Sequence, residues 1–211
     1  MSIKILAAAL LLTLPVGGAE GVLPELRVVP TAGGSIFFVK NVQAQLSQPL
    51  TAFLIELVDY PGSFYQLFED DITTGSLAPG QEKRIPVTNM TVGAVPDYVK
   101  LQAAIYADGT TAGVPDRVEK LVARRRFRLD TVQDLIRRIG TSKEDAAGSL
   151  KRAAEGMTMP KDKGSQVAIN YAAGRALIAD ITDFLGKHSV EETLAQLQKW
   201  EKNLRDSKPG L

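Results

Sequence analysis

The feature that most constrains this chain is a stretch, residues 52–60, that would be apolar on both faces of a β-strand. The side chains of one face are all apolar: Phe53, Ile55 and Leu57. Those of the other face are apolar apart from Glu56, and they are Leu54, Val58 and Tyr60. A strand that is apolar on both faces has to be covered on both faces. Another part of the chain should therefore lie over the second face, which would otherwise be an interaction surface for a foreign polypeptide.

Residues 20–112 predict an immunoglobulin-like β-sandwich. Apolar and polar residues alternate over 99–106 with the period of a half-buried strand. Turn dipeptides such as Pro61-Gly62 and Asp108-Gly109 separate short strands at close intervals. We expect five or six strands, whereas a full sandwich of this type has about seven. Because Pro115 and a helical pattern follow Asp108-Gly109, the last strand is expected to be missing.

Residues 113–211 predict a region of three to four helices, so the fold class is α+β. Residues 114–139 repeat apolar side chains every three or four positions, with Pro115 in the first turn and Gly140 at the end. We expect this long helix to pack on the sandwich. The other helices are expected at about 142–155, 165–186 and 189–206. Ser142 is the expected N-cap of the first of these, and Ser189 with Glu192 forms a capping box for the last.

Residues 1–19 read as a signal peptide, cleaved near Ala19. Lys4 precedes a ten-residue stretch, 5–14, that is apolar apart from Thr13, and Pro15 and small residues follow. No later stretch is long and apolar enough to span a membrane, so the mature chain should have no transmembrane segment. The chain has no cysteine, and an exported chain without disulfides is typical of a bacterial protein. We therefore expect a periplasmic or secreted bacterial protein.

Charge is divided unevenly along the chain. Residues 20–111 hold five basic and ten acidic residues, whereas residues 112–152 hold eleven basic and six acidic residues. The basic excess includes an arginine cluster, in which Arg124, Arg125 and Arg128 form a possible interaction surface. Nucleic acid is a poor candidate partner because aromatic residues are not interleaved with the arginines and the chain is expected to be exported. The interpretation we favour is that the basic helix docks on the acidic sandwich of its own chain.

The residue inventory excludes several kinds of chemistry. The absence of cysteine excludes a thiol nucleophile and Cys-ligated metal, and one histidine, His188, cannot build a site of several imidazoles. We interpret His188 as a cation at the C-terminal end of the third predicted helix. Neither a glycine-rich phosphate loop nor a dinucleotide fingerprint is present. No cofactor is therefore expected.

Carboxylates are the remaining candidates for chemistry. Glu69, Asp70 and Asp71 form an acidic run, with Asp59 nearby in sequence. Oxygen ligands of this kind suit Ca²⁺, although the spacing is not that of a calcium loop. Two carboxylates are also enough for a glycosidase-type hydrolase. The default interpretation is a solvated acidic loop.

Three stretches, LTAFLIELVDYPG, KLQAAIYADGTT and QLQKWEKNLRDSKPG, resemble a group of uncharacterised exported bacterial proteins. The resemblance implies an immunoglobulin-like domain followed by helices, and it implies no function. We expect a non-enzymatic binding or structural module of the bacterial envelope, with a protein partner or self-association. The alternatives are a carboxylate-based hydrolase or calcium-binding protein, and a strand-accepting assembly or chaperone-like subunit.

Overall fold

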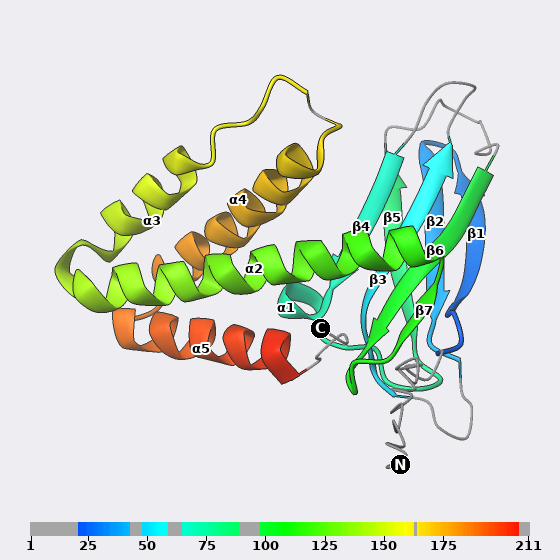
Figure 1. Cartoon of the computed structure of the whole chain (residues 1–211), viewed down its shortest axis with the longest axis horizontal. Coiled ribbons are helices and arrows are strands. Elements are labelled where there is room, and N and C mark those ends of the chain that lie inside the picture. Colours follow the sequence, from blue (N-terminus) through cyan, green and yellow to red (C-terminus); the bar gives the residue numbers. More distant parts are fainter. Residues whose placement is uncertain (1–20, 43–47, 59–64, 89–97, 163, 207–211) are drawn as a thin grey trace, which may run out of the picture.

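The computed structural model describes residues 21–42, 48–58, 65–88, 98–162 and 164–206. It shows an α+β protein in which two antiparallel sheets are followed by four helices (Figure 1). None of the helices in these ranges is both long and apolar enough to cross a membrane.

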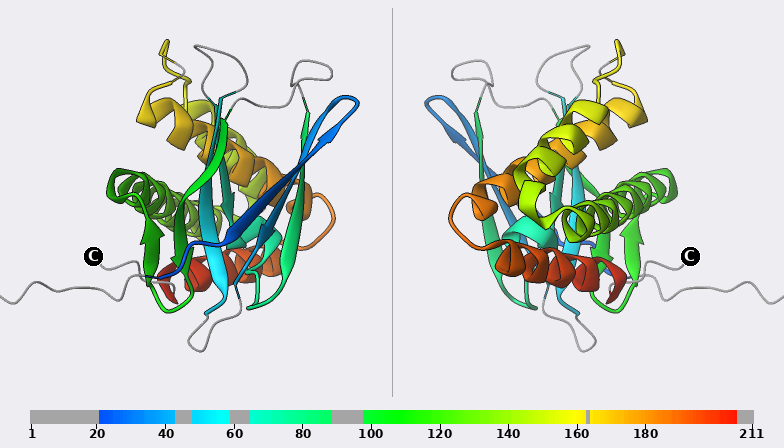
Figure 2. Two further views of the ribbon diagram at one scale, coloured as in Figure 1. Left: turned by 90° about the vertical axis from the view of Figure 1, so that its right-hand side faces the viewer. Right: turned by 90° about the vertical axis from the view of Figure 1, so that its left-hand side faces the viewer.

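The two sheets pack face to face around a shared apolar core (Figure 2). The three-stranded sheet has the order β1-β2-β5, with bounds Glu25–Thr31, Gly34–Lys40 and Glu82–Thr88. The four-stranded sheet has the order β4-β3-β6-β7, with bounds Tyr65–Asp70, Leu50–Val58, Tyr98–Tyr106 and Thr111–Gly113. Phe37 of β2 and Ile55 of β3 are fully buried between the sheets. The alternation of side chains along each strand therefore builds a sandwich.

The strand count of five or six is corrected to seven within the described residues. The chain does return after the turn at Asp108-Gly109, as β7, which pairs with β6 over three residues. Gly113 ends β7 with a φ of 113°, and Val114 N then donates to Gln102 O at 2.8 Å. The strand is short because Pro115 starts a helix immediately afterwards. The other strand missing from the sequence prediction is β4, which ends in Glu69 and Asp70 of the acidic run.

Helix α2, Pro115–Thr141, covers the second face of β3. Leu121 of α2, flanked by Val118 and Val122, packs on a buried layer of the four-stranded sheet. That layer consists of Ala52, Leu54, Ala103 and Ile105. Leu54 has no exposed surface, so it is part of the core and not an interaction surface. Val58 ends β3, and Tyr60 lies outside the described residues.

The second half of α2 is the centre of the helical layer. Helices α3 (Ala146–Gly156), α4 (Gln166–Leu185) and α5 (Val190–Asp206) pack around it, with α3 and α4 above α2 and α5 below it in Figure 1. Val132, Leu135 and Ile139 of α2 are buried there, together with Trp200 of α5. One helix therefore belongs to two cores, one shared with the sheet and one shared with the other helices.

The helix ends match the sequence only in part. The capping box of α5 is confirmed, because Ser189 N donates to Glu192 Oε2 at 2.8 Å and Glu192 N donates to Ser189 Oγ at 3.2 Å. Ser142 is not the N-cap of α3, which is Asp145; Ser142 is the C-cap of α2, where its N–H donates to Ile139 O at 3.2 Å, and its side chain makes no capping hydrogen bond to the turn that follows. A short 3-10 turn, Lys143–Asp145, precedes α3. Gly140 does not end α2 but lies inside its last turn. Glycine lowers the stability of a helix without preventing it, so α2 continues to Thr141.

Candidate functional site

The acidic run lies where the sandwich meets the helical layer. Asp70 is the last residue of β4 and the N-cap of a single-turn helix, α1 (Asp71–Thr74), in which Ile72 N donates to Asp70 Oδ1 at 3.1 Å. Ile72 itself is 6% exposed and belongs to the core of the helical layer. The run is therefore a connection between the two layers, and the interpretation as a solvated loop is wrong.

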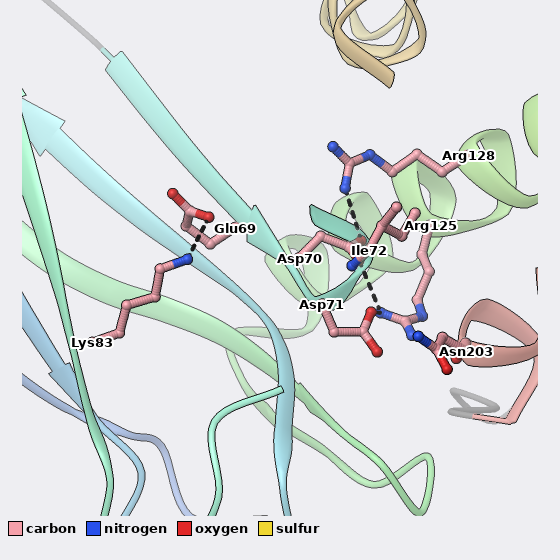
Figure 3. Close-up of polar contacts among 8 residues, drawn as sticks. All are labelled: Glu69, Asp70, Asp71, Ile72, Lys83, Arg125, Arg128 and Asn203. Carbon is pink, nitrogen blue, oxygen red and sulfur yellow. Dashed lines mark hydrogen bonds and ion pairs between the residues drawn. The ribbon is translucent and has the colours of Figure 1, made fainter. Parts of the chain in front are cut away.

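Two arginines of α2 point at these carboxylates (Figure 3). Arg125 Nη1 lies 3.2 Å from Asp71 Oδ1 and 3.6 Å from Asp70 Oδ1, and Arg128 Nη1 lies 3.3 Å from Asp70 Oδ2. Arg125 Nη2 also donates to Asn203 O of α5 at 3.1 Å. All four charged side chains are at most 8% exposed. Strand β4 and helices α1, α2 and α5 thus meet at one buried ion cluster.

The two carboxyl groups of this cluster have opposite pKa shifts. Burial alone would raise the pKa of Asp70, but the charges of Arg128 and Arg125 outweigh it and the pKa is lowered. Burial raises the pKa of Asp71 to about 7, and the hydrogen bond with Asp70 adds to this shift while Arg125 opposes it. Because two adjacent carboxylates repel each other, one of the pair holds a proton over a wider pH range than the other.

Two further ion pairs involve carboxylates of the sandwich, one with a lysine of the sandwich itself and one with an arginine of α2. Lys83 Nζ of β5 lies 2.9 Å from Glu69 Oε2 of β4, which links the edges of the two sheets. Arg117 of α2 pairs with the buried carboxylate of Glu56, beside Leu54 on the face that α2 covers. The uneven charge along the sequence therefore corresponds to docking within the chain.

The arginine cluster is divided by its burial. Arg125 and Arg128 are 2% and 7% exposed, so the hypothesis that they form an interaction surface is wrong. A helix repeats every 3.6 residues, and both residues fall on the inner face of α2. Arg124 is partly exposed and lies over the ring of Phe68, 4.3 Å from its centroid.

The proposed carboxylate site is not brought together. Glu69 points to Lys83, whereas Asp70 and Asp71 point to the arginines (Figure 3). Asp59 lies outside the described residues. Within the described ranges, no three His, Cys, Asp or Glu side chains are grouped so that they could hold a metal ion.

His188 lies just beyond the C-terminal end of α4. Its ring stacks on Phe184, with 4.0 Å between ring centroids, and its Nδ1 lies 3.9 Å from Glu192 Oε2. These contacts join the end of α4 to the first turn of α5. His188 therefore has neighbours typical of a structural residue at a helix–helix connection.

The edge strand β7 is bonded to residues that precede the sandwich. Gly21 N donates to Thr111 O at 2.9 Å, and the hydroxyl of Tyr106 donates to the carbonyl of Val22. A cavity of about 370 Å³ lies here, bordered by Gly113 and the first turn of α2. A strand-accepting subunit would need a free edge strand, but the edge strand β7 already accepts a hydrogen bond at Thr111 from Gly21 of the same chain.

The larger hollow is a groove of about 870 Å³ between α3 and α4, which the sequence analysis did not find. Buried Leu150 and Ile178 form its floor. Its walls are mainly small apolar residues, and these are Ala147, Ala154, Ala176 and Ala179. Its charged residues are Lys151, Arg175, Asp183 and Lys187. The alanine-rich composition of α4 was visible in the sequence, but which alanines are exposed depends on the packing of the helices.

Comparison with known proteins finds no matching family model, and no curated protein or solved structure matches the chain.

Proposed function

We propose that this chain is a non-enzymatic binding module of the bacterial envelope that presents the groove between α3 and α4 to a protein partner. The observation that carries the proposal is the groove itself, whose walls are small apolar residues and whose rim is charged. An exposed apolar hollow with a charged rim is the usual form of a surface that binds another protein. Residues with short side chains at such a surface allow a partner helix to approach closely.

The rest of the molecule holds the groove in a fixed position. Its α4 wall belongs to a helix that packs against α2, and α2 is fixed to the sandwich by the apolar contacts of Leu121 and by the buried ion cluster. A binding surface on rigid elements loses less conformational entropy when it binds than one on loops. In this proposal the sandwich is structural and the helical layer carries the interaction.

The contacts of the carboxylates argue against an enzyme. Asp70 and Asp71 are engaged by Arg125 and Arg128, and neither carboxylate lines the groove or the cavity beside β7. The acid of the groove, Asp183, is paired with Lys187 at 2.7 Å. A hydrolase of the two-carboxylate type needs both acids facing one substrate cleft.

The proposal includes export and an immunoglobulin-like sandwich. Two face-to-face antiparallel sheets with the orders β1-β2-β5 and β4-β3-β6-β7 have the strand number of such a domain. A chain cleaved near Ala19 would begin just before Gly21, which is hydrogen bonded to β7. Export predicts that the mature protein, purified from the envelope fraction of the producing bacterium, starts at or near Glu20 by N-terminal sequencing.

Site-specific photocrosslinking tests the binding surface. A photoreactive amino acid replaces Ala176 in the groove, and a matched control carries it at Gln198, which is exposed on α5 outside the groove. Irradiation of cells that export each variant should give discrete adducts for position 176 and none for position 198. If position 176 gives no adduct of any kind, or both positions give the same adducts, the groove is not the binding surface.

A further inference from the structure

The outer face of α4 in the groove has the composition of a buried helix. Of the twenty residues of α4 only Arg175, Asp180 and Asp183 are charged, whereas α5 has seven charged residues among seventeen. Apolar residues are spread around α4 instead of being confined to one face, and a helix of that kind is normally covered on all sides. Its inner face meets the helical core, whereas its outer face lines the groove. Among the described residues, no element covers the groove.

The exposed residues of that outer face follow one stripe. They recur at spacings of three or four positions, and they are Ala172, Ala176, Ala179, Asp183 and Gly186. Arg175 and Thr182 flank the stripe and are exposed as well. A spacing of this kind is the seam along which two α-helices pack. The small side chains set a short distance between the helix axes.

Asp183 of the stripe and Arg175 beside it are arranged symmetrically about Ala179. Arg175 lies four positions before Ala179 and Asp183 lies four positions after it. In an antiparallel pair of identical helices that cross at Ala179, Arg175 of each copy is opposite Asp183 of the other. The same register puts Ala172 opposite Gly186. Within the part of the chain that the structure describes, no ion pair involves Arg175.

We infer that the groove binds a second copy of this chain, with the two α4 helices packed antiparallel about a two-fold axis at Ala179. Self-complementarity of one patch is the requirement for a two-fold interface, and the Arg175–Asp183 arrangement meets it. This inference rests on the proposed function, since it names the partner of the same groove. An acidic helix of another protein would pair with Arg175 alone, whereas a second copy supplies an acid for Arg175 and an arginine for Asp183, whose partner in the single chain is Lys187.

The experiment is a charge exchange followed by sedimentation velocity on the mature protein at about 100 µM, well above a micromolar dissociation constant. The wild type should be a dimer. Arg175→Glu puts two acids opposite each other at both ends of the seam, and Asp183→Arg puts two arginines there. Because each variant has two repelling pairs, its dissociation constant should rise about tenfold or more. An equimolar mixture of the two variants restores opposite charges at both ends and should form a mixed dimer.

The controls separate a loss of dimer from a loss of folding. Both substitutions are at exposed positions, so the circular dichroism spectrum of each variant should match that of the wild type, and the unfolding midpoints should agree at a concentration low enough for all three proteins to be monomeric. Asp180→Arg, a charge reversal on α4 outside the groove lining, should leave the dimer intact. A monomeric wild type overturns the inference, as does a dimer that both single variants leave unchanged or a mixture that stays monomeric.

Failure of the dimer and failure of the proposed function give different results. If the wild type is monomeric but position 176 crosslinks to another protein, the binding function stands and the second copy is ruled out. If the wild type is monomeric and position 176 gives no adduct, both proposals fail. An adduct of twice the monomer mass supports both.

Discussion

Replacement of Arg125 by methionine tests whether the buried ion cluster holds the two layers together. Methionine keeps the apolar stem but removes the charge that lies 3.2 Å from Asp71 and 3.6 Å from Asp70. It also removes the hydrogen bond to Asn203 O, which fixes α5. Removing one partner of a buried ion pair costs about 3–5 kcal/mol. Arg128 remains beside Asp70, and Asp71 can take up a proton, so we expect a loss near the lower end, about 3 kcal/mol.

The assay is equilibrium unfolding in urea near neutral pH, followed by two signals. Trp200, the single tryptophan, is 6% exposed in the helical layer, so its fluorescence reports that layer. Circular dichroism reports the whole chain. Arg126→Met is the matched control, because Arg126 is adjacent on α2 but exposed, and its loss should stay within about 0.5 kcal/mol.

The position of the cluster predicts a second effect. Since Arg125 joins α2 to β4, α1 and α5, its loss should let the tryptophan fluorescence change at a lower urea concentration than the circular dichroism of the whole chain. The reasoning fails if Arg125→Met loses less than about 1 kcal/mol. It also fails if the Arg126 control loses as much, because helix propensity or net charge would then explain the effect.

Four further substitutions test other parts of the structure. Folded Asp71, whose pKa is raised from 3.8 to about 7, keeps a proton that the unfolded chain loses, so its contribution to stability declines as pH rises from about 4 to 7. Asp71→Asn should flatten that decline, as measured by urea unfolding at pH values across this window, and an unchanged slope would contradict the shift. Leu121→Ala should lower the free energy of unfolding by about 2–5 kcal/mol, because it opens a cavity over the sheet; a loss similar to that of an exposed alanine substitution would mean that α2 does not cover the sheet. Gly113→Ala should prevent stable folding, since its φ is 113° and the new Cβ would lie 2.1 Å from Gln102 O. Gly140→Ala, with nothing within 4 Å and a helical backbone, should instead raise the thermal midpoint slightly.

Local sequence patterns were sufficient for most of the elements. Alternation with a period of two located β6, a stretch that is apolar on both faces located β3, and a repeat of three to four residues located α2 and α4. The capping box at Ser189 was also readable, because its hydrogen bonds join residues three positions apart. Patterns of this kind depend only on residues that are close together in the chain, so they can be recognised before the fold is known.

The elements that were wrongly predicted from the sequence have weak or ambiguous local patterns. Strand β4 ends in two acids, Glu69 and Asp70, and a third, Asp71, follows them; such an acidic run resembles a loop until its partners are known. Strand β7 has three residues, too few to show any alternation. Ser142 is followed by residues that suit a helix start, but the helix before it continues to Thr141. The two strands are fixed by pairing with β3 and β6, and Ser142 is fixed by the end of the preceding helix, where it bonds Ile139.

By itself the sequence determined that β3 needs cover on both faces and that a basic helix follows an acidic sandwich. Hydrophobic alternation and charge composition are properties of the chain, and they hold in any fold that it can adopt. Only the tertiary structure decided that Arg125 meets Asp71, and that Asn203, seventy-eight positions further along the chain, accepts a hydrogen bond from it. It also decided which alanines of α4 face the groove. Such pairings depend on how helices and sheets are docked in space, and no local pattern of residues encodes that docking.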